Sequence, residues 1–177
     1  MATDRTLLLA LLLMRPAFAA DDQEIQRLSE EKNYKELFAR FKGIADSQAR
    51  NAGYSLADLA SAKYNLGVMY QQGLGIPKND AKALLWYEKA ALAGQVKAQF
   101  NLGLMYYEGQ GTARDFSQAR YWLEKAAQQG YADAAYQLGE MYQAGQGVPQ
   151  DAALAEAWRR RAVSHSEEPN ENAIQTK

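Results

Sequence analysis

Few residue types in this chain could carry out chemistry. His165 is the single histidine, and the sequence contains no cysteine. A zinc site or a Ser-His or Cys-His nucleophile needs several such side chains near one another, so the sequence argues against these enzyme classes. Aspartate and glutamate are so numerous that spacing alone does not exclude a catalytic carboxylate pair, but none of them repeats a glycosidase-like signature. We therefore expect no catalytic site, no metal and no cofactor.

Ser29 and Lys32 form an S-x-x-K sequence. In that pattern a serine one helical turn from a lysine can be activated as an acylating nucleophile. The S-D-N and K-T-G sequences that accompany the motif are missing. We interpret the two residues as solvated helix surface, and keep a cell-envelope hydrolase or penicillin-recognising, β-lactamase-like protein as the alternative.

Three pairs of glycines could suggest a phosphate-binding loop. Such loops lead from a strand into the N-terminus of a helix, whose positive dipole end attracts the phosphate. These pairs follow the C-terminal ends of predicted helices, which is the wrong polarity, so we expect no phosphate site. The pairs are Gly73 and Gly75, Gly109 and Gly111, and Gly145 and Gly147.

The charge of the chain is nearly balanced. It carries 20 basic and 21 acidic side chains, for a formal net charge of −1. This balance gives no electrostatic reason to expect a nucleic acid or an anionic membrane as partner. With 47% hydrophobic residues and four prolines, the composition is that of a folded protein.

Residues 1–20 have the layout of a signal peptide. Arg5 precedes the apolar run Leu7–Met14, and small residues follow at Ala17–Ala20. The run is shorter than the roughly 20 apolar residues that cross a bilayer, so a membrane anchor is the weaker alternative. We predict cleavage after Ala19 or Ala20 and a periplasmic or secreted mature protein.

The rest of the chain is organised by an internal repeat of 36 residues. Three segments align without a gap, and each contains a leucine-glycine pair followed by methionine and tyrosine. The second half of each copy carries one tryptophan at the same position. Repeats of this length are supersecondary units that stack and share one core. The aligned segments are Ala62–Tyr70, Ala98–Tyr106 and Ala134–Tyr142, and the tryptophans are Trp86, Trp122 and Trp158.

Each repeat is predicted to contain two helices joined by a turn. Ala62, Leu66 and Met69 have the spacing of an apolar helical stripe. The glycine pairs then end the first helix and turn the chain. An aspartate ahead of each second helix is expected to cap it, because a carboxylate accepts the unpaired N–H groups there. These aspartates are Asp80, Asp115 and Asp151.

Gly67, Gly103 and Gly139 lie inside the first helices. Glycine in a helix interior costs roughly 1 kcal/mol relative to alanine. The recurrence predicts that the tryptophan-bearing helix approaches closely at this position.

The pattern A-x-x-x-L-G-x-M-Y-x-x-G-x-G, followed by a W-x-E-K-A-A segment, resembles the Sel-1-like repeat family, in its bacterial exported type. The resemblance covers about residues 60 to 163. It implies an all-α fold, an α/α right-handed superhelix or solenoid, in which the first helices line a concave side. It also implies a non-catalytic module or scaffold that binds a protein or peptide partner on that side.

The predicted organisation is a signal peptide at 1–20, a helical cap at 21–59, repeats at 60–95, 96–131 and 132–165, and a disordered tail at 166–177. Within the cap, Asn33–Phe41 looks like a lone second helix of a degenerate leading repeat. Ser55–Asp58 reads as a capping box that starts the next helix early. Arg159–Arg161 is interpreted as a basic helix end.

Candidate partner-binding residues lie on the first helices, away from the Ala62-Leu66-Met69 stripe. The aromatic positions Tyr64, Phe100 and Tyr136 recur in phase, which favours packing over a binding groove. Positions that vary between repeats are the better candidates for specificity. The variable candidates are Ser61, Lys97 and Asp133; Val68, Leu104 and Glu140; and Gln71, Tyr107 and Gln143. A further alternative is a structural subunit of an envelope complex.

Overall fold

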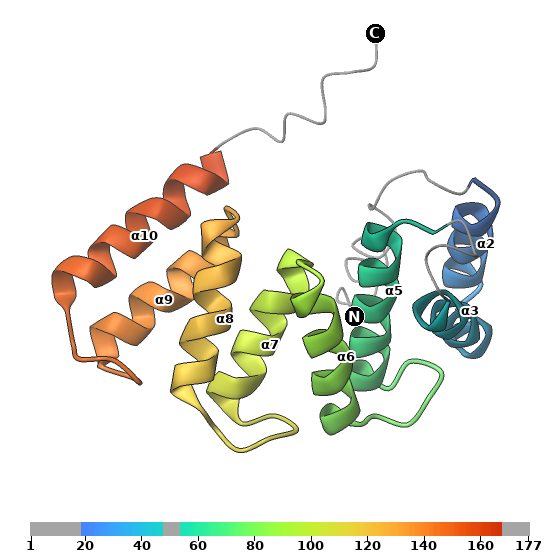
Figure 1. Cartoon of the computed structure of the whole chain (residues 1–177), viewed down its shortest axis with the longest axis horizontal. Coiled ribbons are helices and arrows are strands. Elements are labelled where there is room, and N and C mark those ends of the chain that lie inside the picture. Colours follow the sequence, from blue (N-terminus) through green and yellow to red (C-terminus); the bar gives the residue numbers. More distant parts are fainter. Residues whose placement is uncertain (1–18, 48–53, 168–177) are drawn as a thin grey trace, which may run out of the picture. The chain divides into compact units, whose positions relative to one another are not determined.

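A computed structural model describes residues 19–47 and 54–167. Every regular element in these ranges is a helix (Figure 1), which confirms the all-α prediction. No helix in the described ranges is long and apolar enough to cross a membrane. The predicted signal peptide lies outside the described residues, apart from its last two alanines. The helices are α2 (Ala19–Glu30), α3 (Tyr34–Asp46), α5 (Leu56–Gln72), α6 (Asp80–Leu92), α7 (Val96–Glu108), α8 (Phe116–Gln128), α9 (Ala132–Ala144) and α10 (Ala152–Glu167).

The chain divides into two compact units, residues 1–95 and 96–177. In the first unit α5 packs along α6, and α3 packs on α5. Their shared core includes Leu37, Phe41, Leu66 and Met69. Leu66 and Met69 belong to the stripe that the sequence predicts as apolar, so the helical period places them in the core as expected.

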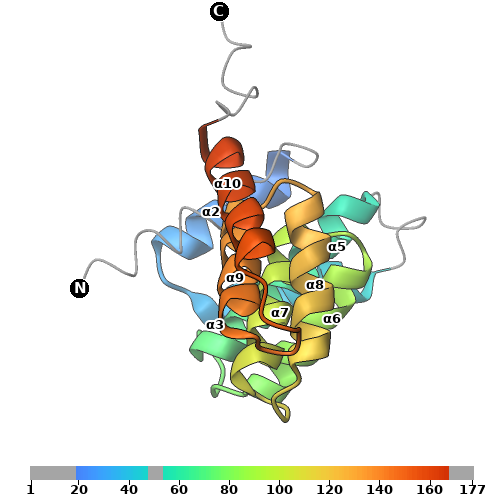
Figure 2. The same cartoon turned by 90° about the vertical axis from the view of Figure 1, so that its left-hand side faces the viewer.

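The second unit contains α7 to α10, in which each helix packs on the next along the chain. Figures 1 and 2 show α9 and α10 side by side, with α8 next to α9. The core joins Leu123 and Ala127 of α8 to Leu138 and Met141 of α9. The third repeat therefore closes the core of the second, as stacked repeats require.

The glycines inside the first helices lie under the second helices, as predicted. A Cβ added at Gly103 would lie 2.8 Å from Leu123 Cγ. One at Gly67 would lie 2.5 Å from the ring of Tyr87. Each of these contacts is made by the residue after the tryptophan, so no side chain larger than hydrogen fits without a shift of the helix pair.

The second helices are capped as expected in two of the three repeats. Asp115 accepts the backbone N–H groups of Ser117 and Gln118, and Asp151 accepts that of Leu154. The prediction that Asp80 caps α6 was wrong. The N-cap is Asn79, whose side chain accepts a hydrogen bond from the backbone N–H of Lys82. Asn79 is in phase with Asp115 and Asp151, whereas Asp80 is one residue late. The predicted capping box at Ser55 and Asp58 is confirmed.

The prediction of a lone helix around residues 33–41 was also wrong. α2 precedes α3 and packs on it, so the leading segment is a helix pair. Leu28 and Ser29 of α2 are buried, like the leucine-glycine pairs of the repeats. At the other end, α10 continues to Glu167, into the predicted tail, and the rest of the tail lies outside the described residues.

Candidate functional site

In the second repeat, two of the candidate residues contact side chains at or beyond the start of α9. The rings of Phe100 and Tyr131 lie 5.0 Å apart between centroids. The Tyr107 hydroxyl donates to Gln146 Oε1 at 2.6 Å, and its ring lies 5.4 Å from that of Phe116. Phe100 and Tyr107 therefore help to hold the next repeat in place.

In the first repeat, the corresponding side chains are tied to α6. The Tyr64 ring lies 5.7 Å from that of Tyr87, whose hydroxyl donates to Gln71 Oε1 at 2.8 Å. Val68 is buried. These three candidates contribute to packing within the first unit, and Val68 has almost no surface to offer a partner.

The four candidates on α9 are placed differently. Asp133, Tyr136, Glu140 and Gln143 follow one another at steps of three, four and three residues, so they lie along one side of the helix. We call this surface the α9 face. Tyr136 is 54% exposed, Asp133 and Gln143 are exposed, and Glu140 is half-buried. Of the other candidates on the second unit, Lys97 and Leu104 are half-buried.

An ion pair links the α9 face to α10. Arg159 Nη2 lies 2.9 Å from Glu140 Oε1, and Arg159 Nε donates to the same oxygen at 3.2 Å. The hydrogen bond to Glu140 raises the pKa of Arg159, despite some desolvation. Because both side chains are partly exposed, the pair orients the groups more than it stabilises the fold.

The prediction that Arg159–Arg161 is a basic helix end was wrong, because α10 continues to Glu167 and the three arginines lie in its middle. Arg159 reaches across to Glu140, and Arg161 lies 5.5 Å from the ring centre of Trp158. One signal in the sequence could have predicted the Arg159 contact. Arg159 occupies the repeat position of Tyr87 and Leu123, whose side chains lie over the glycine of the first helix.

The S-x-x-K residues are not arranged for catalysis. Ser29 is 1% exposed on α2, so its hydroxyl is not open to a substrate. Lys32 lies beyond the end of α2 with φ of 55°. A nucleophilic serine must lie within hydrogen-bonding distance of its base. The Ser29 hydroxyl has no hydrogen-bond partner among the described residues, so Lys32 does not activate it. Within the described ranges no group of three or more metal-binding side chains occurs.

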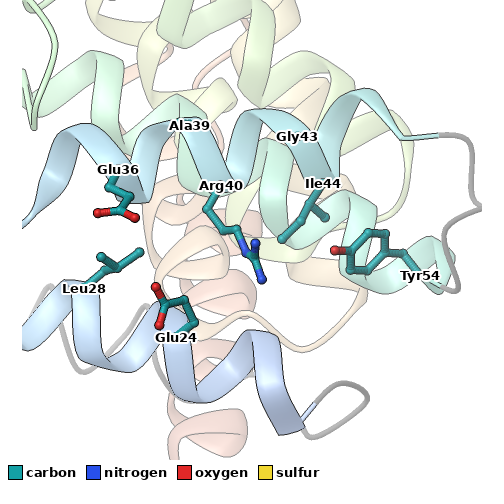
Figure 3. A pocket seen from close by; sticks show the side chains of 8 residues that line it. All are labelled: Glu24, Leu28, Glu36, Ala39, Arg40, Gly43, Ile44 and Tyr54. Carbon is teal, nitrogen blue, oxygen red and sulfur yellow. The ribbon is translucent and has the colours of Figure 1, made fainter.

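A pocket of about 350 Å³ lies between α2 and α3 (Figure 3). Two of its carboxylates are already hydrogen-bonded: Glu24 accepts from Arg27 at 2.7 Å, and Glu36 accepts from Asn33 at 2.7 Å. The pKa of Glu24 is lowered by that contact, so it stays ionised and is not suited to act as an acid. The lining residues are Glu24, Leu28, Glu36, Ala39, Arg40, Gly43, Ile44 and Tyr54.

The repeat pattern, the helix pairs and the glycine contacts together define a helical repeat protein, and comparison with known families names the class. The Sel1 repeat model matches residues 60–95, 96–131 and 132–166. The chain belongs to the Sel1 repeat family. A comparison with curated proteins gave no significant match.

Two solved structures share this fold. A Sel1 repeat protein from Oxalobacter formigenes is 32% identical, with a TM-score of 0.68, over 82% of this chain and 56% of that one. A protective antigen present in uropathogenic Escherichia coli strains, described as having an SLR fold, is 30% identical, with a TM-score of 0.61, over 82% of this chain and 33% of that one. This chain thus spans about half and a third of the lengths of these relatives.

Membership of the family supports the predicted fold class, an α/α solenoid. Sel1 repeat proteins are generally protein-interaction modules without catalytic activity. Which residues of this chain contact a partner, and whether they face a concave side, stays a prediction.

Proposed function

We propose that this protein binds a protein or peptide partner through the α9 face, centred on Tyr136. The observation that carries the proposal is the exposure of this tyrosine. Its counterpart Phe100 packs against Tyr131, the residue that precedes α9, whereas Tyr136 is 54% exposed. An exposed aromatic ring flanked by polar groups is typical of a residue that anchors an interface.

The chemistry of the α9 face indicates what kind of partner it suits. Asp133 adds a carboxylate one turn before Tyr136, while the charge of Glu140 is balanced by Arg159. A cationic side chain of the partner could contact both the Asp133 carboxylate and the face of the Tyr136 ring. The amide of Gln143 offers a hydrogen-bonding group further along the same side.

A photo-crosslinking experiment tests this proposal. A photoreactive phenylalanine analogue placed at residue 136 should yield one discrete adduct in cells, because the ring contacts the partner directly. The matched control is residue 121, a tyrosine of the same unit that is 48% exposed on α8. An adduct from position 121 and none from position 136 would reject the α9 face as the binding surface.

We also propose that the protein is exported. Three features of the sequence support export: Arg5, the apolar run Leu7–Met14 and the small residues Ala17–Ala20. Mass spectrometry of the protein from its native cells should find a chain that begins at Ala20 or Asp21. An intact Met1–Lys177 chain recovered from the cytosol would contradict this proposal.

A further inference from the structure

The leading helix pair departs from the repeats at two positions of its second helix. Asn33 is the N-cap of α3, as Asn79 is of α6 and Asp115 of α8. The residues four, eight and eleven positions after each N-cap are buried, so α3 has the register of the second helices. These buried residues are Leu37, Phe41 and Ile44; Ala83, Tyr87 and Ala90; and Ala119, Leu123 and Ala126.

In this register an arginine and a glycine replace a tryptophan and a cation. Arg40 takes the position of Trp86, and Gly43 takes that of Lys89. On α6 the Lys89 Nζ lies 4.4 Å from the centre of the Trp86 ring. The helix α3 therefore lacks both the indole and the cation that covers it. The same positions hold Trp122 and Lys125 on α8, and Trp158 and Arg161 on α10.

Packing does not explain Gly43. A Cβ added there would meet no atom within 4 Å, whereas one at Gly67 or Gly103 would clash with the second helix. Glycine inside a helix lowers stability relative to alanine, so its presence without a close neighbour points to another reason. Gly43 lines the pocket between α2 and α3, and a side chain at this position would extend into that space.

The pocket has the size and the lining of a small-molecule site. Its volume of about 350 Å³ lies at the lower end of the range for such sites. Leu28 and Ile44 give it an apolar floor, since they are 1% and 6% exposed. Tyr54, which comes just before α5, adds a ring and a hydroxyl at one end (Figure 3). All of the lining residues belong to the first unit and to the described ranges.

Charged groups of both signs surround this apolar floor. Figure 3 shows Glu24 of α2, and Glu36 and Arg40 of α3, with their charged ends in the space between the two helices. Arg27 donates to both oxygens of Glu24, at 2.7 and 3.0 Å, and Asn33 donates to Glu36 at 2.7 Å. These contacts orient the carboxylates, and each carboxylate keeps lone pairs that can accept a hydrogen bond from a ligand.

We propose that this pocket binds a small zwitterion, namely a free α-amino acid or a dipeptide with an aliphatic side chain. Its carboxylate pairs with the Arg40 guanidinium, its ammonium group with Glu24 and Glu36, and its side chain packs on Leu28 and Ile44. A ligand with a single charge would match only part of the lining. The inference goes beyond the proposed function, because the pocket lies in the first unit and the α9 face in the second.

Isothermal titration calorimetry with defined probes tests the inference. The probes are L-leucine and L-leucyl-L-leucine, titrated into the full 177-residue protein. Saturable binding of L-leucine is expected for an amino-acid site, and binding of the dipeptide alone for a peptide site. The C-terminal amide and the N-acetyl derivative of the bound probe each lack one charge, so each should bind at least tenfold more weakly. No binding of either probe, or equal binding of either derivative, would overturn the proposal.

Variants of the lining locate the binding site. Gly43→Leu should abolish binding by filling the pocket, and it should not lower the melting temperature, because the added Cβ meets no atom. Arg40→Gln should weaken binding at least tenfold and provides a second test that adds no bulk. The matched control is Lys125→Leu, at the same repeat position on α8, which should leave binding unchanged. Binding to Gly43→Leu and Arg40→Gln that equals binding to the wild type would place the ligand elsewhere and overturn the inference.

Discussion

The second and third repeats share one sequence pattern, yet their equivalent residues have different surroundings. Phe100 and Ala127 of the second repeat pack in a core that includes residues of α9, whereas Tyr136 and Val163 at the same positions are more than half exposed. The residue types differ little, so the presence or absence of a following helix sets their exposure. A repeat position is therefore structural in one copy and available for binding in the next.

The largest effect that tests this comparison is expected from Leu123→Ala in the second repeat. Leu123 is fully buried above Gly103, and its removal leaves a cavity that should lower the free energy of unfolding by about 2–5 kcal/mol. The equivalent Arg159→Ala should change it little, because the guanidinium is partly exposed. Urea unfolding followed by circular dichroism measures both, and equal losses would show that the two repeats are packed alike.

Gly147→Ala should be the next most damaging change. This glycine of the third repeat has φ of 71°, and a Cβ there would lie 2.4 Å from Phe116 Cβ of the second repeat. Left-handed backbone strain and overpacking together should cost about 2–4 kcal/mol. Gly145→Ala is the control, because it has a similar φ of 66° but its nearest neighbour would be 3.4 Å away. Similar melting temperatures for the two variants would mean that the contact with Phe116 does not hold the repeats together.

Removing the helix caps should also destabilise the second repeat more than the third, but by a smaller free energy of unfolding. Asp115 accepts two backbone N–H groups and caps α8, which packs on both α7 and α9. Asp151 accepts one backbone N–H group and caps α10. We expect Asp115→Ala to cost about 1 kcal/mol and Asp151→Ala less, since loss of a cap costs about 0.5–2 kcal/mol. Thermal unfolding of the two variants provides the comparison. A larger loss for Asp151→Ala would indicate that α10 is the more tightly held helix.

The smallest effect concerns the pH dependence of the contact between Phe100 and Tyr131. Burial, and secondarily the charge of Asp133, raises the pKa of Tyr131, which packs on Phe100. The folded protein therefore favours the neutral phenol, while the unfolded chain ionises at its ordinary pKa of about 10. This contribution to stability is complete below that pH and is lost as the pH rises through the higher folded pKa.

Tyr131→Phe should consequently flatten the alkaline end of the stability profile. Urea midpoints measured across the alkaline range would show a shallower decline for the variant than for the wild type. Parallel profiles would show that Tyr131 does not titrate differently in the folded protein.

Much of the fold could be predicted from the sequence, because its signals are local. The period of 36 residues, the apolar stripe around Leu66 and the glycines under the second helices all reappear in the structure as expected. The error at Asp80 came from preferring a carboxylate, although the period itself marks Asn79. The helix α2 was missed because its turn into α3 lacks the glycine pair that marks the other turns.

The candidate site was less predictable. The sequence placed Tyr64, Phe100 and Tyr136 at one repeat position, but it could not tell which of them stays exposed. Nor could it show that Arg159, rather than a leucine or tyrosine, lies over the glycine of the third repeat and pairs with Glu140. Both outcomes depend on how one helix is rotated against another.

The sequence by itself determined the helix pairs of the three repeats and the turns within them, because hydrophobic periodicity and glycine act over a few residues. Only the tertiary structure decided which surface is open, because the cover of a given residue comes from the next repeat. Tyr107, for example, donates to Gln146, 39 residues further along the chain. On α9 and α10 no described helix of the second unit supplies that cover, and Tyr136 and Val163 are more than half exposed.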